Sequence, residues 1–273
     1  LHLPTGANIL DLCCGQGRHL FALASLGFCN LEGLDRSHYL IQKAKAMAKK
    51  EGTGIKFREG DARRLPYPPD SFDSVLILGN SFGYFDAPED DLRVLREVLR
   101  VLKPSGLVLI DVADGAFLKA SFQKRSWEWI GKKQFVCRER ALSNDQVRLI
   151  TREIVVHAEK GILVDQFYAE RIYTKASLEQ LLRGAGFQGV AFHGETQTES
   201  SRNQDLGMME RRLWLSGQAK KEWTTLKPKP KAKASPLSIV VILGDPSKPD
   251  PIKPSGLFDE DDLCTIDRLK EAL

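Results

Sequence analysis

The sequence predicts an α/β protein with a doubly wound, Rossmann-like parallel sheet. Apolar runs of strand length alternate with segments of helical period from residue 9 to residue 112. The run at 72–78 is almost continuously apolar, as a central parallel strand needs when helices cover both of its faces. From residue 9 to residue 26, a short apolar run, a turn with two glycines and a helical pattern follow one another. This order is half of a βαβ unit.

The expected elements of the sheet domain follow in regular order. Strands are expected at 9–12, 31–35, 55–58, 72–78 and 107–112, with helices at 18–26, 39–50 and 88–102. A helix at 178–183 and strands at 190–192 and 208–216 complete a sheet of seven strands. Ser37 suits the N-cap of the helix at 39–50 and Gly52 its end, while Ser177 suits the N-cap of the helix at 178–183.

The pattern changes between the fifth strand and the last helix. Residues 117–173 carry short alternating apolar runs, with turn signals at Asn144-Asp145 and Lys160-Gly161. Such alternation is typical of antiparallel strands. We therefore expect an antiparallel β insert at 113–176, after the fifth strand, within a domain that spans residues 1–218.

Composition favours a soluble cytoplasmic protein. Of 273 residues, 42% are hydrophobic, and the net charge of +4 is too mild to indicate nucleic acid. The five cysteines lack ligand-like spacing, so reduced thiols are expected and no metal site is predicted. No apolar run is long enough to span a membrane. The first strand follows Leu1 closely, which indicates a piece of a longer protein.

The C-terminal part has a different composition. Residues 219–236 predict a basic linker rich in proline and lysine. Residues 237–273 contain a buried-strand signal and a helical pattern, which predict the start of a second α/β domain or a tail. The run from Ile239 to Gly244 resembles the opening of an ATP-grasp ligase of the D-alanine–D-alanine ligase type. Fusion to a further C-terminal domain is therefore an expectation.

The turn after the first strand is shaped for a nucleoside. Gly15 and Gly17 let a ligand approach the backbone, where the N–H groups of the helix start point outward. Asp35 ends the next strand about twenty residues past Gly15, where a carboxylate can accept both hydrogen bonds of a ribose diol. Leu20 occupies the position where a dinucleotide-binding motif has its third glycine. This disfavours pyrophosphate binding and weakens the case for an NAD-dependent oxidoreductase. Asp11 would repel phosphate but suits a ligand with an ammonium group.

These residues together carry a resemblance to a known family. Asp11 followed by Gly15-x-Gly17, then Asp35 and Gly60-Asp61-Ala62, resemble the class I S-adenosylmethionine-dependent methyltransferases over residues 6–218. The resemblance implies S-adenosyl-L-methionine as cofactor and assigns its binding residues. Its methionine end would lie at Asp11, Cys13, Gly15 and Gly17, its ribose at Asp35, and its adenine at Asp61 and the Ala62 backbone, with Asn80 as a further contact. Cys13 stands where the family often has glycine.

The resemblance also implies a place for the acceptor. Small-molecule methyltransferases of this kind often carry an antiparallel insert over the pocket. Tyr84 follows the fourth strand, and Arg171 and Tyr173 lead out of the insert, so these three are candidate substrate-binding residues. No general base is assigned, and His157, His193 and Glu195 are candidates only.

We therefore predict methyl transfer to a nitrogen or oxygen of a small molecule. Two alternatives stay open. One is an RNA methyltransferase that uses the basic segment at 220–233, although the sequence lacks the Asn/Asp-Pro-Pro-aromatic motif of base-methylating enzymes. The other is a non-catalytic nucleoside-binding domain of a multidomain ligase.

Overall fold

The computed structural model describes residues 3–130, 132–194 and 211–221. The strands of the main sheet are β1 (Asn8–Leu12), β2 (Asn30–Asp35), β3 (Lys56–Glu59), β4 (Phe72–Ile77), β5 (Leu102–Ala113), β10 (Phe187–His193) and β11 (Arg212–Ala219). Its helices are α1 (Arg18–Ser25), α2 (His38–Glu51), α3 (Pro88–Val101) and α5 (Lys175–Ala185). Within the described ranges, none of the helices is long and apolar enough to cross a membrane.

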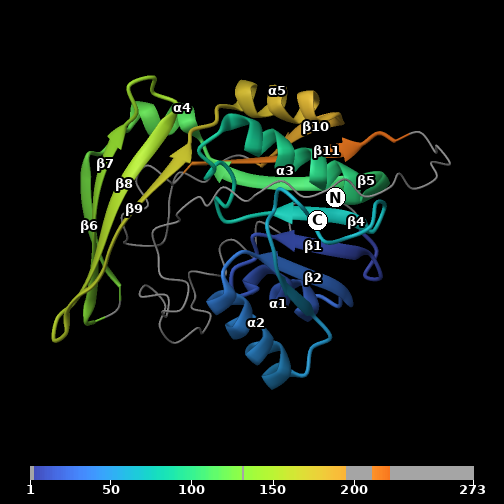
Figure 1. The fold of residues 1–273 in the computed structure, drawn as a ribbon, viewed down its shortest axis with the longest axis horizontal. Helices are drawn as coiled ribbons and strands as arrows, with labels where there is room; N and C mark the ends of the chain where they lie inside the picture. Colours follow the sequence, from blue (N-terminus) through green and yellow to red (C-terminus); the bar gives the residue numbers. More distant parts are fainter. Residues whose placement is uncertain (1–2, 131, 195–210, 222–273) are drawn as a thin grey trace, which may run out of the picture.

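The seven strands of the main sheet run in the order β10-β11-β5-β4-β1-β2-β3 (Figure 1). The five strands from β1 to β5 are parallel to one another, whereas β11 is antiparallel to both β5 and β10. The strand order reverses beside β1 and β4, and in open α/β sheets ligands bind at such a switch point. The expected doubly wound sheet is confirmed.

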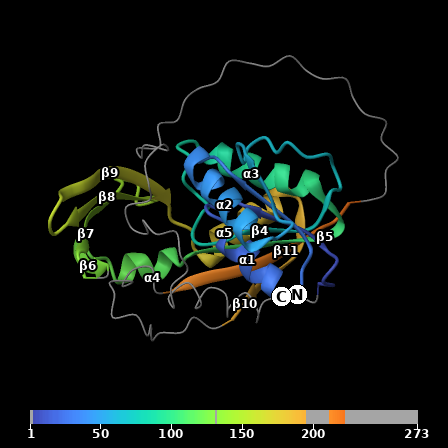
Figure 2. The same cartoon turned by 90° about the horizontal axis from the view of Figure 1, so that it is seen from below.

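Two apolar clusters cover opposite faces of this sheet. On one face, Leu10 and Leu12 of β1 pack with buried residues of α3 and α5. On the other face, Ile9 packs with buried residues of α1 and α2. Successive side chains of a strand point to opposite faces, so β1 serves both clusters. Figures 1 and 2 show the helices on both sides of the sheet.

The predicted antiparallel insert is a separate four-stranded sheet. Its strands β6 (Arg125–Ile130), β7 (Gln134–Leu142), β8 (Arg148–His157) and β9 (Gly161–Arg171) pair in chain order. A short helix, α4 (Gly115–Ala120), precedes them and is capped by Asp114, whose side chain accepts from the Ala116 N–H. The insert lies to one side of the main sheet in both views (Figures 1 and 2).

Several boundaries differ from expectation. Helix α5 begins at Lys175 because Thr174, not Ser177, is its N-cap; Ser177 completes a capping box with Thr174. Residues 103–106 continue strand β5 rather than forming a turn, and a register irregularity against β4 accommodates them. The predicted caps Ser37 and Gly52 are confirmed.

The start of the expected strand at 208–216 and the Glu195 candidate lie outside the described residues, as do all but the first residues of the 219–236 linker. The C-terminal segment 237–273 lies outside them as well. The linker and the second domain therefore stay predictions.

Candidate functional site

A cavity of about 470 Å³ lies where β1, β2 and β4 end. Seven of the sequence-predicted site residues line it: Cys13, Gly15, Asp35, Asp61, Ala62, Asn80 and Tyr84. Four others are not among its lining residues: Asp11 belongs to β1, Gly17 is the N-cap of α1, and Arg171 and Tyr173 lie at the end of the insert. The structure thus brings together most of the predicted residues from four separate loops.

The turn between β1 and α1 has left-handed backbone at three positions. Cys13 has φ 62°, Gly15 φ 55° and Gly17 φ 86°. The Cys13 N–H donates to the Leu34 carbonyl at 2.7 Å, which holds the turn against β2. A Cβ on Gly17 would lie 2.6 Å from the Phe57 ring, so both the conformation and the space favour glycine. Gly17 therefore shapes the cavity wall as the N-cap of α1.

Asp35 connects the first turn to the start of α2. Its Oδ2 accepts from the Gly15 N–H and its Oδ1 accepts from the Ser37 N–H, both at 2.8 Å. Burial raises the pKa of this carboxyl, although both backbone hydrogen bonds act in the opposite direction. This partly buried carboxylate at the end of the second strand can accept further hydrogen bonds, because each oxygen has two lone pairs.

Asp11 and His19 form a second buried polar pair. Asp11 is 1% exposed, and neither of its carboxylate oxygens has a hydrogen-bond partner. His19 Nδ1 lies 3.4 Å from Asp11 Oδ2, and His19 itself lines the cavity. A buried carboxylate without hydrogen bonds is costly, since its desolvation is not offset. A cation that reaches this pair would remove that cost.

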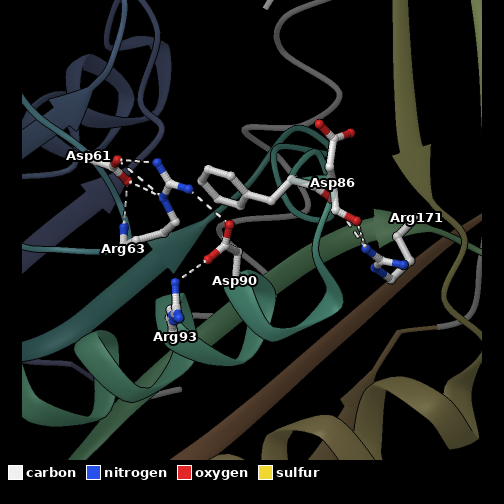
Figure 3. A network of polar contacts seen from close by, with 7 residues as sticks. Asp61, Arg63, Asp86, Asp90, Arg93 and Arg171 are labelled. Atoms are coloured by element: carbon white, nitrogen blue, oxygen red, sulfur yellow. Dashed lines mark hydrogen bonds and ion pairs between the residues drawn. The ribbon is translucent and has the colours of Figure 1, made fainter. Parts of the chain in front are cut away.

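Asp61 belongs to a chain of ion pairs (Figure 3). Arg63 contacts Asp61 at 2.7 Å and Asp90 at 2.9 Å, and Arg93 reaches the other oxygen of Asp90 at 2.9 Å. Burial opposes the charge of Asp61, but the hydrogen bonds from Arg63 outweigh it and lower the pKa of Asp61. The Arg63 guanidinium also lies 4.5 Å from the centre of the Phe85 ring. The network fixes the loop after β3 against α3.

Arg171 and Tyr173 lie where the insert rejoins the sheet domain. Both donate to the fully buried carboxylate of Asp91 on α3, Arg171 at 2.9 Å and Tyr173 at 2.6 Å. Arg171 also donates to the carbonyls of Phe85 and Asp86, the latter contact visible in Figure 3. Their donor groups therefore hold the end of the insert onto the sheet domain, and their contact with substrate stays a prediction.

Asn80 and Tyr84 meet a carboxylate that the sequence did not reveal. Glu170 of β9 is 5% exposed, and its Oε2 accepts from the Asn80 amide and from the Tyr84 hydroxyl at 3.2 Å. Asn80 Oδ1 in turn accepts from the Ala113 N–H at 2.8 Å. Glu170 lies ninety residues from Asn80 in the chain and carries no motif, so only the alternation of β9 hinted that it faces inward.

The histidine candidates for a general base lie elsewhere. His193 of β10 contacts the Ser216 hydroxyl of β11 at 2.7 Å. His157 accepts hydrogen bonds from the N–H groups of Glu159 and Lys160 in the following turn. Neither histidine lines the cavity.

Comparison with known proteins agrees with this geometry. Residues 9–106 match the family model of a methyltransferase domain. The chain is 44% identical over 108 residues to the demethylmenaquinone methyltransferase of Lactococcus lactis, which covers 38% of this chain and 41% of that protein. It is 27% identical over 188 residues to the putative methyltransferase YqeM of Bacillus subtilis, which covers 68% of this chain and 75% of that protein. The chain thus spans less than half of the first relative.

Two solved structures are similar to this fold. The CcbJ methyltransferase from Streptomyces caelestis has a TM-score of 0.67 at 18% identity, covering 79% of this chain and 84% of that chain. The sugar N-methyltransferase KedS8 from Streptoalloteichus has a TM-score of 0.57 at 20% identity, covering 79% of this chain and 81% of that chain. The fold and the match over residues 9–106 are those of a class I S-adenosylmethionine-dependent methyltransferase domain, and S-adenosylmethionine is the cofactor of that class.

Proposed function

We propose that this chain transfers a methyl group to a nitrogen or oxygen atom of a small molecule. The observation that carries the proposal is the cavity of about 470 Å³ at the switch point, lined by Asp35 and by His19, whose Nδ1 lies 3.4 Å from the buried Asp11. This volume lies within the range of about 300–1,000 Å³ that small-molecule sites occupy.

The residues at the adenosine end fit a nucleoside. Asp35 is held by two backbone N–H groups, and its remaining lone pairs can accept from a ribose diol. Asp61 and Ala62 line the same end of the cavity, and Asp61 stays charged beside Arg63. Gly15 leaves space around its Cα, where the nearest side-chain atom to an added Cβ would be 3.9 Å away.

The residues at the other end fit an ammonium group. Asp11 lacks hydrogen bonds, and a positively charged group would supply them. Cys13 and Gly15 line the path between the two ends. Burial raises the pKa of the Cys13 thiol far above its ordinary value, so Cys13 acts here as a small apolar wall rather than as a nucleophile.

The acceptor would enter beside Asn80 and Tyr84, between the cavity and the insert. When bound, the cofactor supplies a sulfonium methyl group for in-line displacement, so the protein has chiefly to align the acceptor and exclude water. Among the similar proteins, one acts on demethylmenaquinone, one is a sugar N-methyltransferase and one is an amino pentose methyltransferase. All three names indicate small-molecule acceptors, which supports that class here.

We also propose that the protein works in the cytoplasm. Among the described residues Cys13, Cys14, Cys29 and Cys137 are free thiols, as a reducing compartment favours.

Two measurements test the proposal. Calorimetric titration with S-adenosylmethionine and S-adenosylhomocysteine should give binding with a Kd in the micromolar range. The loaded protein should then methylate at least one member of a panel of aminosugars, alkylamines, quinols and phenols, with S-adenosylhomocysteine as the other product. Cofactor binding without methylation of any panel member would contradict the small-molecule acceptor.

A further inference from the structure

Tyr84 and Glu170 form a hydrogen-bonded pair between the cavity and the insert. We propose that this pair removes the proton of the acceptor, with Tyr84 as the catalytic phenol and Glu170 as the positioning carboxylate that receives the proton through it. The inference rests on the proposed methyl transfer, and it assigns the general base that the sequence left unassigned.

The pair has a fixed geometry. Tyr84 lines the cavity and donates to Glu170 Oε2 at 3.2 Å. Asn80 braces both partners, because its amide nitrogen contacts the Tyr84 oxygen at 3.4 Å and also donates to Glu170. The Asn80 backbone N–H donates to the Asp111 carbonyl at 3.1 Å, and its side-chain oxygen accepts from Ala113. The pair is therefore held from β5 and from the loop after β4.

The surrounding charges suit a proton acceptor. Glu170 is faced by Tyr84 from the cavity loop and, at longer range, by Arg212 of β11 and Arg140 of β7. Tyr168, the neighbour on the same face of β9, packs against the Tyr84 ring at a centroid distance of 6.4 Å.

These surroundings set the proton affinities of the pair. Burial raises the pKa of Glu170, although hydrogen bonds and both arginines oppose the rise. Burial, followed by the charge of Glu170, raises the pKa of Tyr84 well above its ordinary value. Tyr84 therefore stays a phenol, and Glu170 binds a proton more readily than an ordinary glutamate.

The proposed step balances without another reactant. The acceptor atom forms a bond to the methyl carbon while the bond between methyl and sulfur breaks, and that electron pair stays on sulfur. The acceptor's N–H or O–H bond breaks, and its proton passes to the Tyr84 oxygen. The former Tyr84 proton passes to Glu170 Oε2, which later releases it to solvent.

His19 is the rival base in the cavity. It lies beside Asp11, and its Nε2 is buried without a hydrogen-bond partner. Both oxygens of its neighbour Asp11 lack hydrogen-bond donors. The His19–Asp11 pair therefore suits the binding of a cation better than the removal of a proton. A His19→Gln variant separates the two assignments.

The kinetic test compares Tyr84→Phe, Glu170→Gln and His19→Gln on every panel member that the unchanged protein methylates. Tyr67→Phe and Glu153→Gln are matched controls: Tyr67 is a buried tyrosine that does not line the cavity, and Glu153 is a buried carboxylate of the insert paired with Arg138. We expect kcat to fall about a hundredfold in the first two variants while S-adenosylhomocysteine affinity stays within about threefold. In the unchanged protein kcat/KM should rise with pH through the Glu170 pKa, and Glu170→Gln should lose this rise.

A spectroscopic readout does not depend on turnover. In protein labelled with carbon-13 at the tyrosine ζ position, Tyr84→Phe assigns the Tyr84 resonance. That resonance should shift as Glu170 titrates above the ordinary range for glutamate, about pH 4.3, and Glu170→Gln should abolish the shift.

Three results would overturn the pair. One is full turnover in Tyr84→Phe, another is loss of turnover only in His19→Gln, and the third is a Tyr84 resonance that ignores Glu170. If the unchanged protein binds cofactor but methylates no panel member, the proposed function is contradicted, and so is the role of the pair as its general base. If all the variants retain full turnover, only the role of the pair is contradicted.

Discussion

At the scale of single residues, three wholly or partly buried carboxylates differ in their partners. Glu97 of α3 accepts from the Leu65 N–H and from the guanidinium of Arg100, each at 2.8 Å. Asp35 has only backbone donors, and Asp11 has none. Satisfied carboxylates stabilise a fold, whereas unsatisfied ones are concentrated at functional sites. The contrast separates a structural residue from the two that line or back the cavity.

The charge of Glu97 should give a measurable pH dependence of stability. Burial opposes that charge, but the hydrogen bonds from Arg100 and Leu65 outweigh it and lower the pKa of Glu97. A lowered pKa in the folded state means that the stabilisation is present above the unfolded value, about 4.3, and is lost as pH falls through the folded pKa. Glu97→Gln should therefore cost roughly 1–2 kcal/mol of unfolding free energy at pH 7 and flatten the acid limb.

Urea unfolding at several pH values measures this effect. Glu89→Gln is the matched control, because Glu89 is an exposed residue of the same helix. An equal loss in both variants at pH 7, or an unchanged acid limb in Glu97→Gln, would contradict the assignment.

Residues near a motif were predictable, and long-range partners were not. The spacing from Gly15 predicted the cavity position of Asp35 because a βαβ unit fixes that distance locally. Glu170 was missed because it meets Asn80 only after the insert has folded, and no local pattern encodes that contact. The contact of Arg171 with Asp91 was missed for the same reason, since the two residues lie eighty positions apart.

At the scale of elements, the turn from β1 to α1 determines the cavity wall. Gly17 is the N-cap of α1 in left-handed conformation, and Gly33 of β2 packs against Cys14 and Leu20. The turn is close to both strands because these positions lack side chains. The turn could be predicted from the sequence, because each glycine meets a local steric requirement.

Gly17→Ala should damage both stability and binding. The new methyl group would meet the Phe57 ring at 2.6 Å in a backbone conformation that alanine disfavours, so we expect a cost of about 1–3 kcal/mol. Gly54→Ala is the control, because no atom lies within 4 Å of its added Cβ and its φ is not positive. Thermal unfolding and S-adenosylhomocysteine titration measure the two effects. Equal behaviour of the two variants would show that the turn tolerates a side chain.

At the scale of the whole molecule, the insert is joined to the sheet domain at the end of β9. Arg148 of β8 pairs with Asp86 at 2.8 Å, beside the contacts of Arg171 with Asp91. The alternating pattern at 117–173 predicted an antiparallel insert, which the structure forms with four strands. The pattern could not predict how the insert docks, because docking depends on charges of α3 and of the loop after β4.

Asp91→Ala should loosen this junction. The change leaves Tyr173 without its acceptor and Arg171 with only carbonyl partners, so we expect a loss of about 3–5 kcal/mol of unfolding free energy. Hydrogen exchange should rise at the end of β9 and at 83–86. Glu89→Ala, two residues earlier on the exposed face of α3, should change both readouts little. Unchanged exchange in Asp91→Ala would contradict the docking role.

The most direct test of the whole account is calorimetric titration of S-adenosylhomocysteine into the unchanged protein and into Asp35→Asn. Because the substitution removes the charge that we propose as the acceptor for the ribose hydroxyls, we predict at least about a tenfold loss of affinity, or about 1.4 kcal/mol. Glu59→Gln, at the exposed end of the neighbouring strand β3, should bind as the unchanged protein does. Equal affinity in all three proteins, or no binding to the folded unchanged protein, would contradict the cofactor site described here.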